Sequence, residues 1–368
     1  MKIIIFLKNN IYRIAIGLNL GVSFLLLLSY LSVYTSPYYF YPLAFLGLIY
    51  PFLLILNLLF SIFWISRKSK LFLISLICIL VGFNFITRIC QITVFENKKT
   101  ANENKIKIMS YNVRVFDLWH WSDDKQIANK IFGFIKKNKP EILCMQEFYS
   151  KEGMGKNARD SILKAGSFKY FNISGNTKGK RVINYGVATF SCFPIVASGK
   201  VQTSDNNNYC IFSDLKINDK IVRVYNLHLA SLHLGKKDYL LIDKLKGIDS
   251  IDIDGYKSIF TKFKRGYKKR SLQVNSIVRH MKNCKYPIIL CGDFNDTPMS
   301  YAYQQLSSHL YDAFKISGNG IGYTYINKYP TFRIDYILHS KNIISTGFIV
   351  PHVNYSDHFP ITCELEIN

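Results

Sequence analysis

Three long apolar stretches with few polar positions occupy the first quarter of the chain. They extend over residues 14–34, 43–65 and 71–93. The first two run for 21 and 23 residues without a charge, which is long enough for a helix to cross a hydrocarbon core of about 30 Å. The third is the weakest, because only 17 uncharged residues precede Arg88. The pattern predicts an N-terminal bundle of three transmembrane helices over residues 1–95.

Two other interpretations of these stretches are a cleaved signal peptide and buried core helices. A signal peptide would account for the first stretch only, and no convincing small-x-small cleavage site follows it. Core helices of this length usually carry a polar face, which these stretches lack. Tyrosines at positions 38, 39 and 41 lie near the expected span ends, as in the aromatic belt of membrane proteins. Membrane spanning is therefore the favoured interpretation.

The pattern changes after a polar segment, residues 96–105, which is predicted to be a linker. From residue 105 to 368, short apolar or alternating runs typical of strands are mixed with helical spacing. A helix is expected over 123–137 and helical, charged sequence over 236–283. Strands are expected over 105–111, 141–145, 186–191, 209–217, 221–229, 288–291, 333–338, 343–350 and 361–367. Asn218–Asp219 is typical of a hairpin turn. This mixture predicts a layered α/β (α+β) domain.

The distribution of charge separates the two parts of the chain. The formal net charge is +23, and residues 1–95 contain seven basic residues and no acidic one, which leaves +16 for the remainder. Six of these seven basic residues lie before residue 14 or between residues 66 and 70, the seventh is Arg88 in the third stretch, and residues 35–42 are uncharged. The positive-inside rule then places the N-terminus in the cytoplasm and, after three spans, the second part outside it, in the periplasm of a bacterium. If the third stretch does not cross, the second part is cytoplasmic.

Polar side chains repeatedly follow the predicted strands. Each of them taken alone is typical of a turn or a cap. Together they form a set in which nearly every member carries an oxygen ligand or an imidazole, and strand ends at one edge of a sheet would bring them close together. The set consists of Asn112, Glu147, Asn226, His228, Asp293, Asn295, Asp335, Asp357 and His358.

This set suits the transfer of phosphoryl groups. Carboxylate and amide oxygens favour hard cations such as Mg²⁺, Mn²⁺ or Ca²⁺, whereas zinc sites usually contain thiolates or several imidazoles. A metal ion would polarise a phosphoryl oxygen, a carboxylate such as Asp293 would orient or deprotonate a water, and histidines would stabilise the charge that develops. No nucleophile elbow, phosphate-binding glycine loop, HExxH or dinucleotide motif is present. The eight cysteines show no C-x-x-C spacing and are expected to be buried.

The segments MSYNVR, MQE, YGVATFS, NLHLAS, CGDFND, RIDYIL and SDHFP occur in this order between residues 105 and 368. This series resembles the endonuclease/exonuclease/phosphatase superfamily, which includes deoxyribonucleases, abasic-site endonucleases, neutral sphingomyelinases and inositol-polyphosphate 5-phosphatases. The arrangement as a whole resembles the membrane-anchored bacterial members. The resemblance implies a four-layer αββα sandwich and a hydrolase that depends on Mg²⁺, for which Mn²⁺ would substitute.

The resemblance also implies residue roles. The implied metal ligands are Asn112, Glu147 and Asp357. The implied catalytic residues are His228, Asp293, Asn295, Asp335 and His358, with His358 paired to Asp335. Asn226 and Asn295 would hold phosphate oxygens. Whether Asp293 or His358 acts as the base, and whether one or two metal ions bind, differs among branches and stays open.

The sequence leaves the substrate open among three hypotheses. A nuclease fits the charge of +16, a lipid or other phosphodiesterase fits the proximity of a bilayer, and an inactive binding module would require the loss of a catalytic group. The partners expected are therefore nucleic acid or a membrane lipid headgroup, together with the bilayer itself, and no obligate protein partner is inferred. Residues 257–270 contain seven basic residues. They are interpreted as a docked helix with a solvated basic face or, alternatively, as a binding surface for a polyanion or for anionic lipid headgroups.

Overall fold

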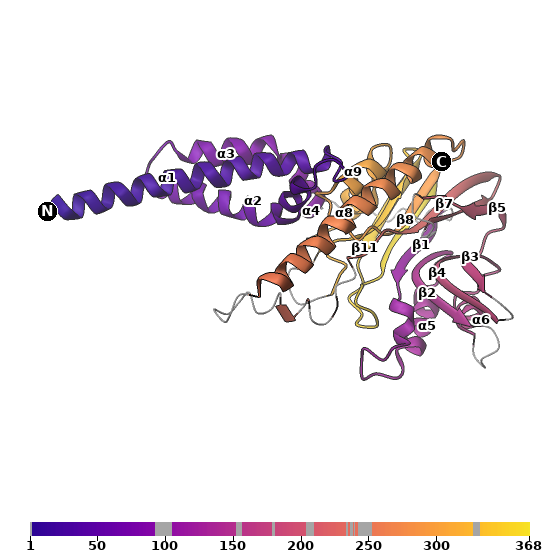
Figure 1. Ribbon diagram of the computed structural model, residues 1–368. Helices are drawn as coiled ribbons and strands as arrows, with labels where there is room; N and C mark the ends of the chain where they lie inside the picture. Colours follow the sequence, from indigo (N-terminus) through magenta and orange to yellow (C-terminus); the bar gives the residue numbers. More distant parts are fainter. Residues whose placement is uncertain are drawn as a thin grey trace.

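The protein consists of a helical arm and a body built on two sheets, as the computed structural model shows (Figure 1). The structure describes residues 2–92, 105–151, 157–178, 181–203, 210–232, 235, 238, 240–241, 252–326 and 332–368. The predicted linker, residues 96–105, lies outside the described residues except for its last position.

The arm follows the three apolar stretches. Its elements are α1 (Lys2–Tyr30), η1 (Leu31–Val33), α2 (Pro42–Ser66), α3 (Phe72–Val81) and α4 (Phe83–Ile89). Two helical segments, Asn10–Val33 and Pro42–Ser66, are long and apolar enough to cross a membrane. The prediction that the third stretch forms a single helix is corrected, because this stretch is divided into α3 and α4, which are bent by 67° relative to each other. If the bent pair forms one span, there are three.

The bend in the third stretch occurs at Gly82, against the end of α1. A Cβ atom at Gly82 would lie 2.1 Å from the ring of Tyr30, so only glycine permits this approach. The Tyr30 ring also stacks on Phe85, with 5.1 Å between ring centroids, and its hydroxyl donates to the Cys78 carbonyl. The close packing of Tyr30 therefore coincides with the break between α3 and α4.

Buried polar side chains connect α1, α2 and α3. Asn19 donates to Ser75 Oγ at 2.6 Å and accepts from the indole of Trp64 at 3.0 Å. Ser23 donates to Asn57 Oδ1 at 2.7 Å. Hydrogen bonds of this kind hold apolar helices together where the hydrophobic effect contributes little.

The body contains two six-stranded sheets. The first has the order β11-β12-β1-β2-β4-β3 and the second the order β5-β6-β7-β8-β10-β9. The first sheet comprises β1 (Lys105–Asn112), β2 (Ile142–Lys151), β3 (Tyr170–Lys178), β4 (Arg181–Ser191), β11 (Ile343–Ile349) and β12 (Ile361–Ile367). The second comprises β5 (Ile195–Lys200), β6 (Cys210–Ile217), β7 (Lys220–His228), β8 (Ile288–Asp293), β9 (Tyr311–Asp312) and β10 (Asp335–His339). Within each sheet one pair is parallel, β1 with β2 and β7 with β8.

Alternating side chains place each sheet between two apolar layers. Ile108 of β1 and Val224 of β7 lie in the core shared by both sheets. Met109, the next residue of β1, packs on the opposite face against Ile131 and other residues of the outer helices. The second sheet is covered in the same way by Val274 and its helical neighbours. The helices outside the sheets are η2 (Arg114–Asp117), α5 (Ile127–Asn138), α6 (Ala158–Gly166), α8 (Ile253–Lys282), α9 (Tyr301–Ser307) and α10 (Ala313–Ser317). The predicted layered α/β architecture is confirmed as a two-sheet sandwich.

Most predicted strands are present, and several elements were not predicted. The hairpin at Asn218–Asp219 is confirmed, since Ile217 pairs with Lys220. The predicted helix over 123–137 begins later, at Ile127. The strands β3, β5 and β9 and the helices α6, α9 and α10 were missed, because these segments are short or mainly polar. Of the helical sequence predicted over 236–283, α8 accounts for the part from Ile253 onward, and most of 236–251 lies outside the described residues.

The arm contacts the body at the segment that follows β8. Met299 belongs to the same apolar cluster as Leu26, Tyr50 and Phe85 of the arm. Ser32 donates to the Met299 carbonyl at 2.8 Å. Arg88 of α4 donates to Gln304 Oε1 at 2.7 Å and its carbonyl accepts from Arg333 at 2.7 Å. The arm is therefore packed directly on the body.

Candidate active site

The ends of three neighbouring strands form the floor of the candidate site. His228 at the end of β7 is in register with Asp293 at the end of β8, and Asp293 is in register with Asp335 at the start of β10. Because β7 and β8 are parallel and β10 is antiparallel to β8, all three side chains lie at the same edge of the second sheet. The predicted gathering of polar residues at one sheet edge is thus observed for these three.

Gly292 permits the close approach of β7 and β8 beside this row. Its φ is +154°, and a Cβ atom there would lie 2.0 Å from the carbonyl oxygen of Leu227. A side chain at this position would push apart the two strands that carry His228 and Asp293.

Asp293 and His358 are the central pair of the site. His358 Nε2 lies 3.6 Å from Asp293 Oδ2, and its Nδ1 lies 2.9 Å from Asp335 Oδ2. Burial raises the pKa of the Asp293 carboxyl to about 6, although both nearby imidazoles act in the opposite direction. Burial would lower the pKa of His358, but the charges of Asp335 and Asp293 outweigh it and raise that pKa to about 10. The two carboxylates therefore favour the protonated form of the imidazole that lies between them. The predicted pairing of His358 with Asp335 is observed.

Glu147 reaches the site from a distortion in β2. The pairing of β2 with β4 shifts register between Met145 and Phe148, and Glu147 has a φ of +49°. Left-handed backbone is unusual for a glutamate inside a strand, and such bulges re-aim side chains near functional sites. Glu147 Oε1 lies 3.9 Å from His228 Nε2, which lies 3.5 Å from Asp293 Oδ2. The partly exposed Glu147 carboxylate and the buried Asp293 carboxylate thus face the same imidazole.

Asn112 and Asp357 complete the edge contributed by the first sheet. Asn112 at the end of β1 donates to Asp293 Oδ2 at 3.0 Å, and its carbonyl accepts from Ser356 Oγ at 2.8 Å. The carboxylate of Asp357 lies 3.3 Å from Arg114 Nε. Hydrogen bonds from Ser356 therefore place the segment that carries Asp357 and His358 next to the end of β1.

The two remaining predicted residues, Asn295 and Asn226, differ in their surroundings. Asn295 is partly exposed, its N–H donates to Asp293 Oδ1 at 2.7 Å, and its amide donates to the Leu229 carbonyl at 3.0 Å. Asn226 is fully buried, and its amide donates to the carbonyls of Met145 and Ala188 in the first sheet. Contact of Asn226 with a phosphate stays a prediction, and it would require at least one of these bonds to be given up.

The structure contains two site residues that lie inside the quoted motif segments but to which the sequence analysis gave no role. The guanidinium of Arg114 contacts the Asp357 carboxylate and also lies over the ring of Trp121, with Cζ 4.3 Å from the ring centroid. Gln146 donates to Asn226 Oδ1 at 2.8 Å and so joins the two sheets below the site. Both residues stand next to a motif residue in the sequence, but only their spatial neighbours show what they contact.

The donor atoms at this edge fit a hard divalent cation. Ligand atoms of Asp293, Asp335 and His358, a group different from the predicted ligands Asn112, Glu147 and Asp357, lie within 4.8 Å of one another. Of these three, the two carboxylates are the oxygen donors, and Asp335 Oδ1 is buried without a hydrogen-bond partner among the described residues. The carboxylates of Glu147 and Asp357 and the amide of Asn112 add oxygen donors beside this group. A set dominated by carboxylate and amide oxygens matches the preference of Mg²⁺ and Mn²⁺.

Comparison with known proteins identifies the family. Residues 109–358 match the Endonuclease/Exonuclease/phosphatase family, and residues 12–89 match a domain of unknown function (DUF8431). The chain therefore belongs to the endonuclease/exonuclease/phosphatase family, whose members are typically hydrolases of phosphoester bonds and generally use a divalent metal ion. A search of curated proteins gave no match.

Solved structures of the same family share the fold of the body. One from Bacteroides vulgatus is 17% identical, with a TM-score of 0.52, and the similarity covers 72% of this chain and 99% of that chain. One from Bacteroides thetaiotaomicron is 19% identical, with a TM-score of 0.51, and covers 72% and 98%. One from Leptotrichia buccalis C-1013-b is 17% identical, with a TM-score of 0.50, and covers 71% and 100%. At these identities the similarity concerns the fold.

The close approach at Gly292 leads to a stability prediction. The Gly292→Ala variant should lose roughly 3 kcal/mol of stability, at the upper end of overpacking costs, because its methyl group would collide with the Leu227 carbonyl. Gly133→Ala, in the exposed interior of α5 with no atom within 4 Å, should instead gain about 1 kcal/mol. Thermal unfolding of the detergent-solubilised chain measures both. An unchanged melting temperature for Gly292→Ala would show that the strands are not this close.

Proposed function

We propose that the chain is a membrane-anchored hydrolase that cleaves phosphodiester bonds with a divalent metal ion, Mg²⁺ or Mn²⁺. The observation that carries this proposal is the convergence around Asp293 of Asn112, His228, Asp335 and His358, with Glu147 facing the same histidine. This arrangement contains six of the nine residues that the motifs implied, and the other three are present in the chain, which disfavours an inactive binding module.

The residues have separate tasks in this proposal. Glu147, Asn112 and Asp357 hold the metal ion, which when bound polarises a phosphoryl oxygen and neutralises developing charge. Asp293, whose carboxylate is fixed by the N–H of Asn295 at 2.7 Å, orients the attacking water in line with the leaving group. The His358 imidazolium, held by Asp335, stabilises the phosphoryl oxygen or donates a proton to it. Asn295 and Asn226 contact the remaining phosphate oxygens, and His228 stabilises charge beside them.

Substitutions at the site should remove activity and leave the fold intact. Glu147→Gln, Asp293→Asn and His358→Gln should each lower kcat by roughly 10²-fold or more on a chromogenic phosphodiester with Mg²⁺, because each removes a charge that acts on the reacting phosphate. Chelation of the metal ion should abolish turnover. The exposed Asp254→Asn and His309→Gln are matched controls that should keep normal rates. Normal turnover in any of the three site variants would contradict the assigned roles.

Two substrate classes have separate support. Nucleic acid is the first, because the net charge of +16 outside the arm favours a polyanion. A phospholipid or sphingomyelin-type phosphodiester, or a phosphoinositide, is the second. The observation that favours it is the contact of Ser32 in the arm with Met299, only six residues after Asp293.

A substrate panel distinguishes these classes. The full-length chain with Mg²⁺ should be offered plasmid, abasic duplex, sphingomyelin and phosphoinositide. We expect plasmid cleavage whose rate falls steeply as salt rises from about 50 to 200 mM, because phosphate contacts release counterions. Lipid turnover without plasmid cleavage would reject the nuclease and support the second class. The Glu147→Gln variant controls for contaminating nuclease.

The division of the chain into an anchor (1–95), a linker (96–105) and a catalytic domain (105–368) forms part of the proposal. The course of the arm supports three crossings. Ser32 after α1 and Arg88 in α4 both contact the segment Pro298–Met299 of the body, so these two ends lie on the same side of the bundle. The N-terminus and the connection between α2 and α3 lie at the far end (Figure 1). If α1 and α2 each cross a membrane, the pair α3–α4 has to cross it a third time to reach the body.

This course predicts the orientation of the protein in a bacterial inner membrane. With the basic residues at positions 67, 68 and 70 in the cytoplasm, the body faces the periplasm. Protease added to spheroplasts should therefore degrade an epitope after Asn368, whereas an epitope before Met1 should be protected until lysis. Protection of the C-terminal epitope in intact spheroplasts would reject this orientation.

A further inference from the structure

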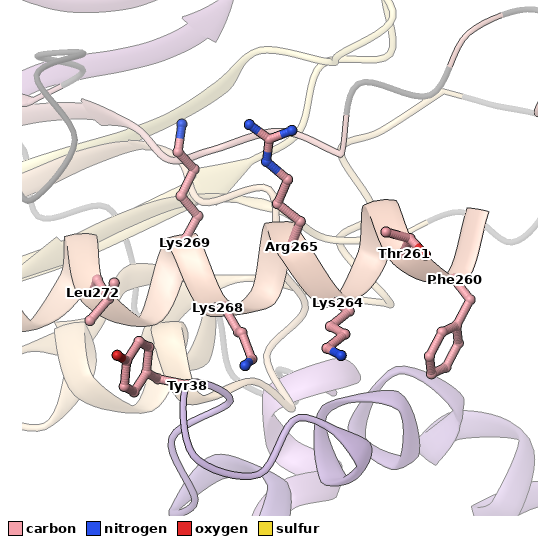
Figure 2. A pocket seen from close by; sticks show the side chains of 8 residues that line it. All are labelled: Tyr38, Phe260, Thr261, Lys264, Arg265, Lys268, Lys269 and Leu272. Carbon is pink, nitrogen blue, oxygen red and sulfur yellow. The ribbon is translucent and has the colours of Figure 1, made fainter. Parts of the chain in front are cut away.

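A basic groove lies along α8, apart from the candidate active site. It has a volume of about 510 Å³ and contains none of the predicted site residues. It is lined by Tyr38, Phe260, Thr261, Lys264, Arg265, Lys268, Lys269 and Leu272 (Figure 2). All but Tyr38 come from one helix at spacings of three and four residues, which places them on a continuous strip of its surface.

The chemistry of the groove is that of an anion site. Four of its lining residues are basic, and none of the described residues that line it is acidic. Lys264 Nζ lies 4.6 Å from the ring centroid of Tyr41, and Lys268 Nζ lies 5.7 Å from that of Tyr38. In Figure 2 these two lysines point toward the arm, and Arg265 and Lys269 point away from it. The apolar side chains of Phe260 and Leu272 close the two ends of the strip.

Aromatic packing fixes the groove at the end of the apolar helices. Phe45 in the first turn of α2 stacks on Phe260, with 4.7 Å between ring centroids, and also contacts Phe263 and Tyr267. The apolar segments of the arm end at Val33 and begin again at Pro42, so the groove lies at the level where the chain would leave the hydrocarbon.

The connection between α1 and α2 carries exposed aromatic side chains at the same level. Tyr38, Tyr39 and Phe40 are 47%, 84% and 52% exposed. Exposed aromatic residues at the ends of apolar helices are typical of the headgroup region of a bilayer. Basic side chains held at that level face lipid phosphates, whereas a solvated basic face on a soluble domain would have no such neighbours.

We propose that this groove binds the phosphate of an anionic phospholipid in the leaflet next to the body. Lys264 and Lys268 bind the headgroup phosphate from the side of the arm, Arg265 and Lys269 add charge above it, and the acyl chains extend along the apolar surface of α2. This inference rests on the membrane anchoring proposed above but requires no hydrolysis. The lipid bound here is a resident ligand and lies outside the active site.

Lipid retention by the full-length chain tests the proposal. The chain, in the inactive Glu147→Gln background, is delipidated in detergent and titrated with phosphatidylglycerol or phosphatidylcholine, and bound lipid is counted by native mass spectrometry. We expect phosphatidylglycerol to be retained in preference to phosphatidylcholine. Glycerol phosphate, which lacks acyl chains, should not displace it.

A matched pair of variants locates the binding. The variant K264Q/R265Q/K268Q/K269Q should lose the preference, by about fivefold in affinity for each charge removed. The control K257Q/R279Q/K282Q/K285Q removes four exposed charges outside the groove and should behave like the parent chain. The variant K264R/K268R/K269R keeps all charges and should retain the lipid.

The other outcomes separate this proposal from the proposed function. Equal retention of both lipids, equal loss in both glutamine variants, or displacement of the lipid by glycerol phosphate or by an oligonucleotide would overturn the lipid site. Selective retention, together with no phosphodiester hydrolysis by the chain that keeps Glu147, would keep the lipid site and reject the hydrolase. Retention without preference for phosphatidylglycerol, together with normal hydrolysis by the chain that keeps Glu147, would reject the lipid site and keep the hydrolase.

Discussion

The buried carboxylate of Asp293 is the constraint on which the rest of the site depends. Only 1% of Asp293 is exposed, and a carboxylate in such surroundings is costly unless several partners compensate for the lost water. The compensation comes from both sheets, through the amide of Asn112, the N–H of Asn295 and two imidazoles at 3.5 and 3.6 Å. A group that needs so many partners fixes their relative positions. The geometry that supports water activation is thus also what makes the burial of Asp293 tolerable.

The segment that follows β8, from Asp293 to Met299, links the site to the arm. The segment that begins with Asp293 continues through Asp296, whose carboxylate pairs with the buried Arg270 of α8, to Met299 in the apolar cluster of the arm. Arg270 in turn precedes Leu272, the last residue of the basic groove. Active site, basic helix and apolar helices are therefore connected through buried contacts within a few residues. These contacts define the orientation of the site relative to the apolar helices.

Much of the fold and of the site could be predicted from sequence patterns, and the misses have physical causes. The motifs around Asn112 and Asp293 predicted which residues gather, because each lies at the end of an apolar strand, whereas His358 lies in the segment before β12 and was predicted from its motif alone. Arg114 and Gln146 belong to the quoted segments MSYNVR and MQE, but their roles were missed because these depend on contacts with Asp357, Trp121 and Asn226. The burial of Asn226, and the bonding of its amide to carbonyls of the other sheet, could not be predicted from its motif, and its contact with phosphate stays a prediction. The bend at Gly82 was missed because it depends on the position of the Tyr30 ring.

Sequence patterns are enough to assign the class of the protein, which has apolar helices followed by an α/β body with a series of acidic and imidazole-bearing motifs. Hydropathy and strand alternation are local properties, and a series of motifs in order is read along the chain, so neither requires coordinates. Three features became visible only in three dimensions. A β-bulge re-aims Glu147, His358 lies between two carboxylates, and α8 packs on the first turn of α2. These features depend on contacts between residues far apart in the sequence. Their energies come from burial and pairing across elements, which no local pattern records.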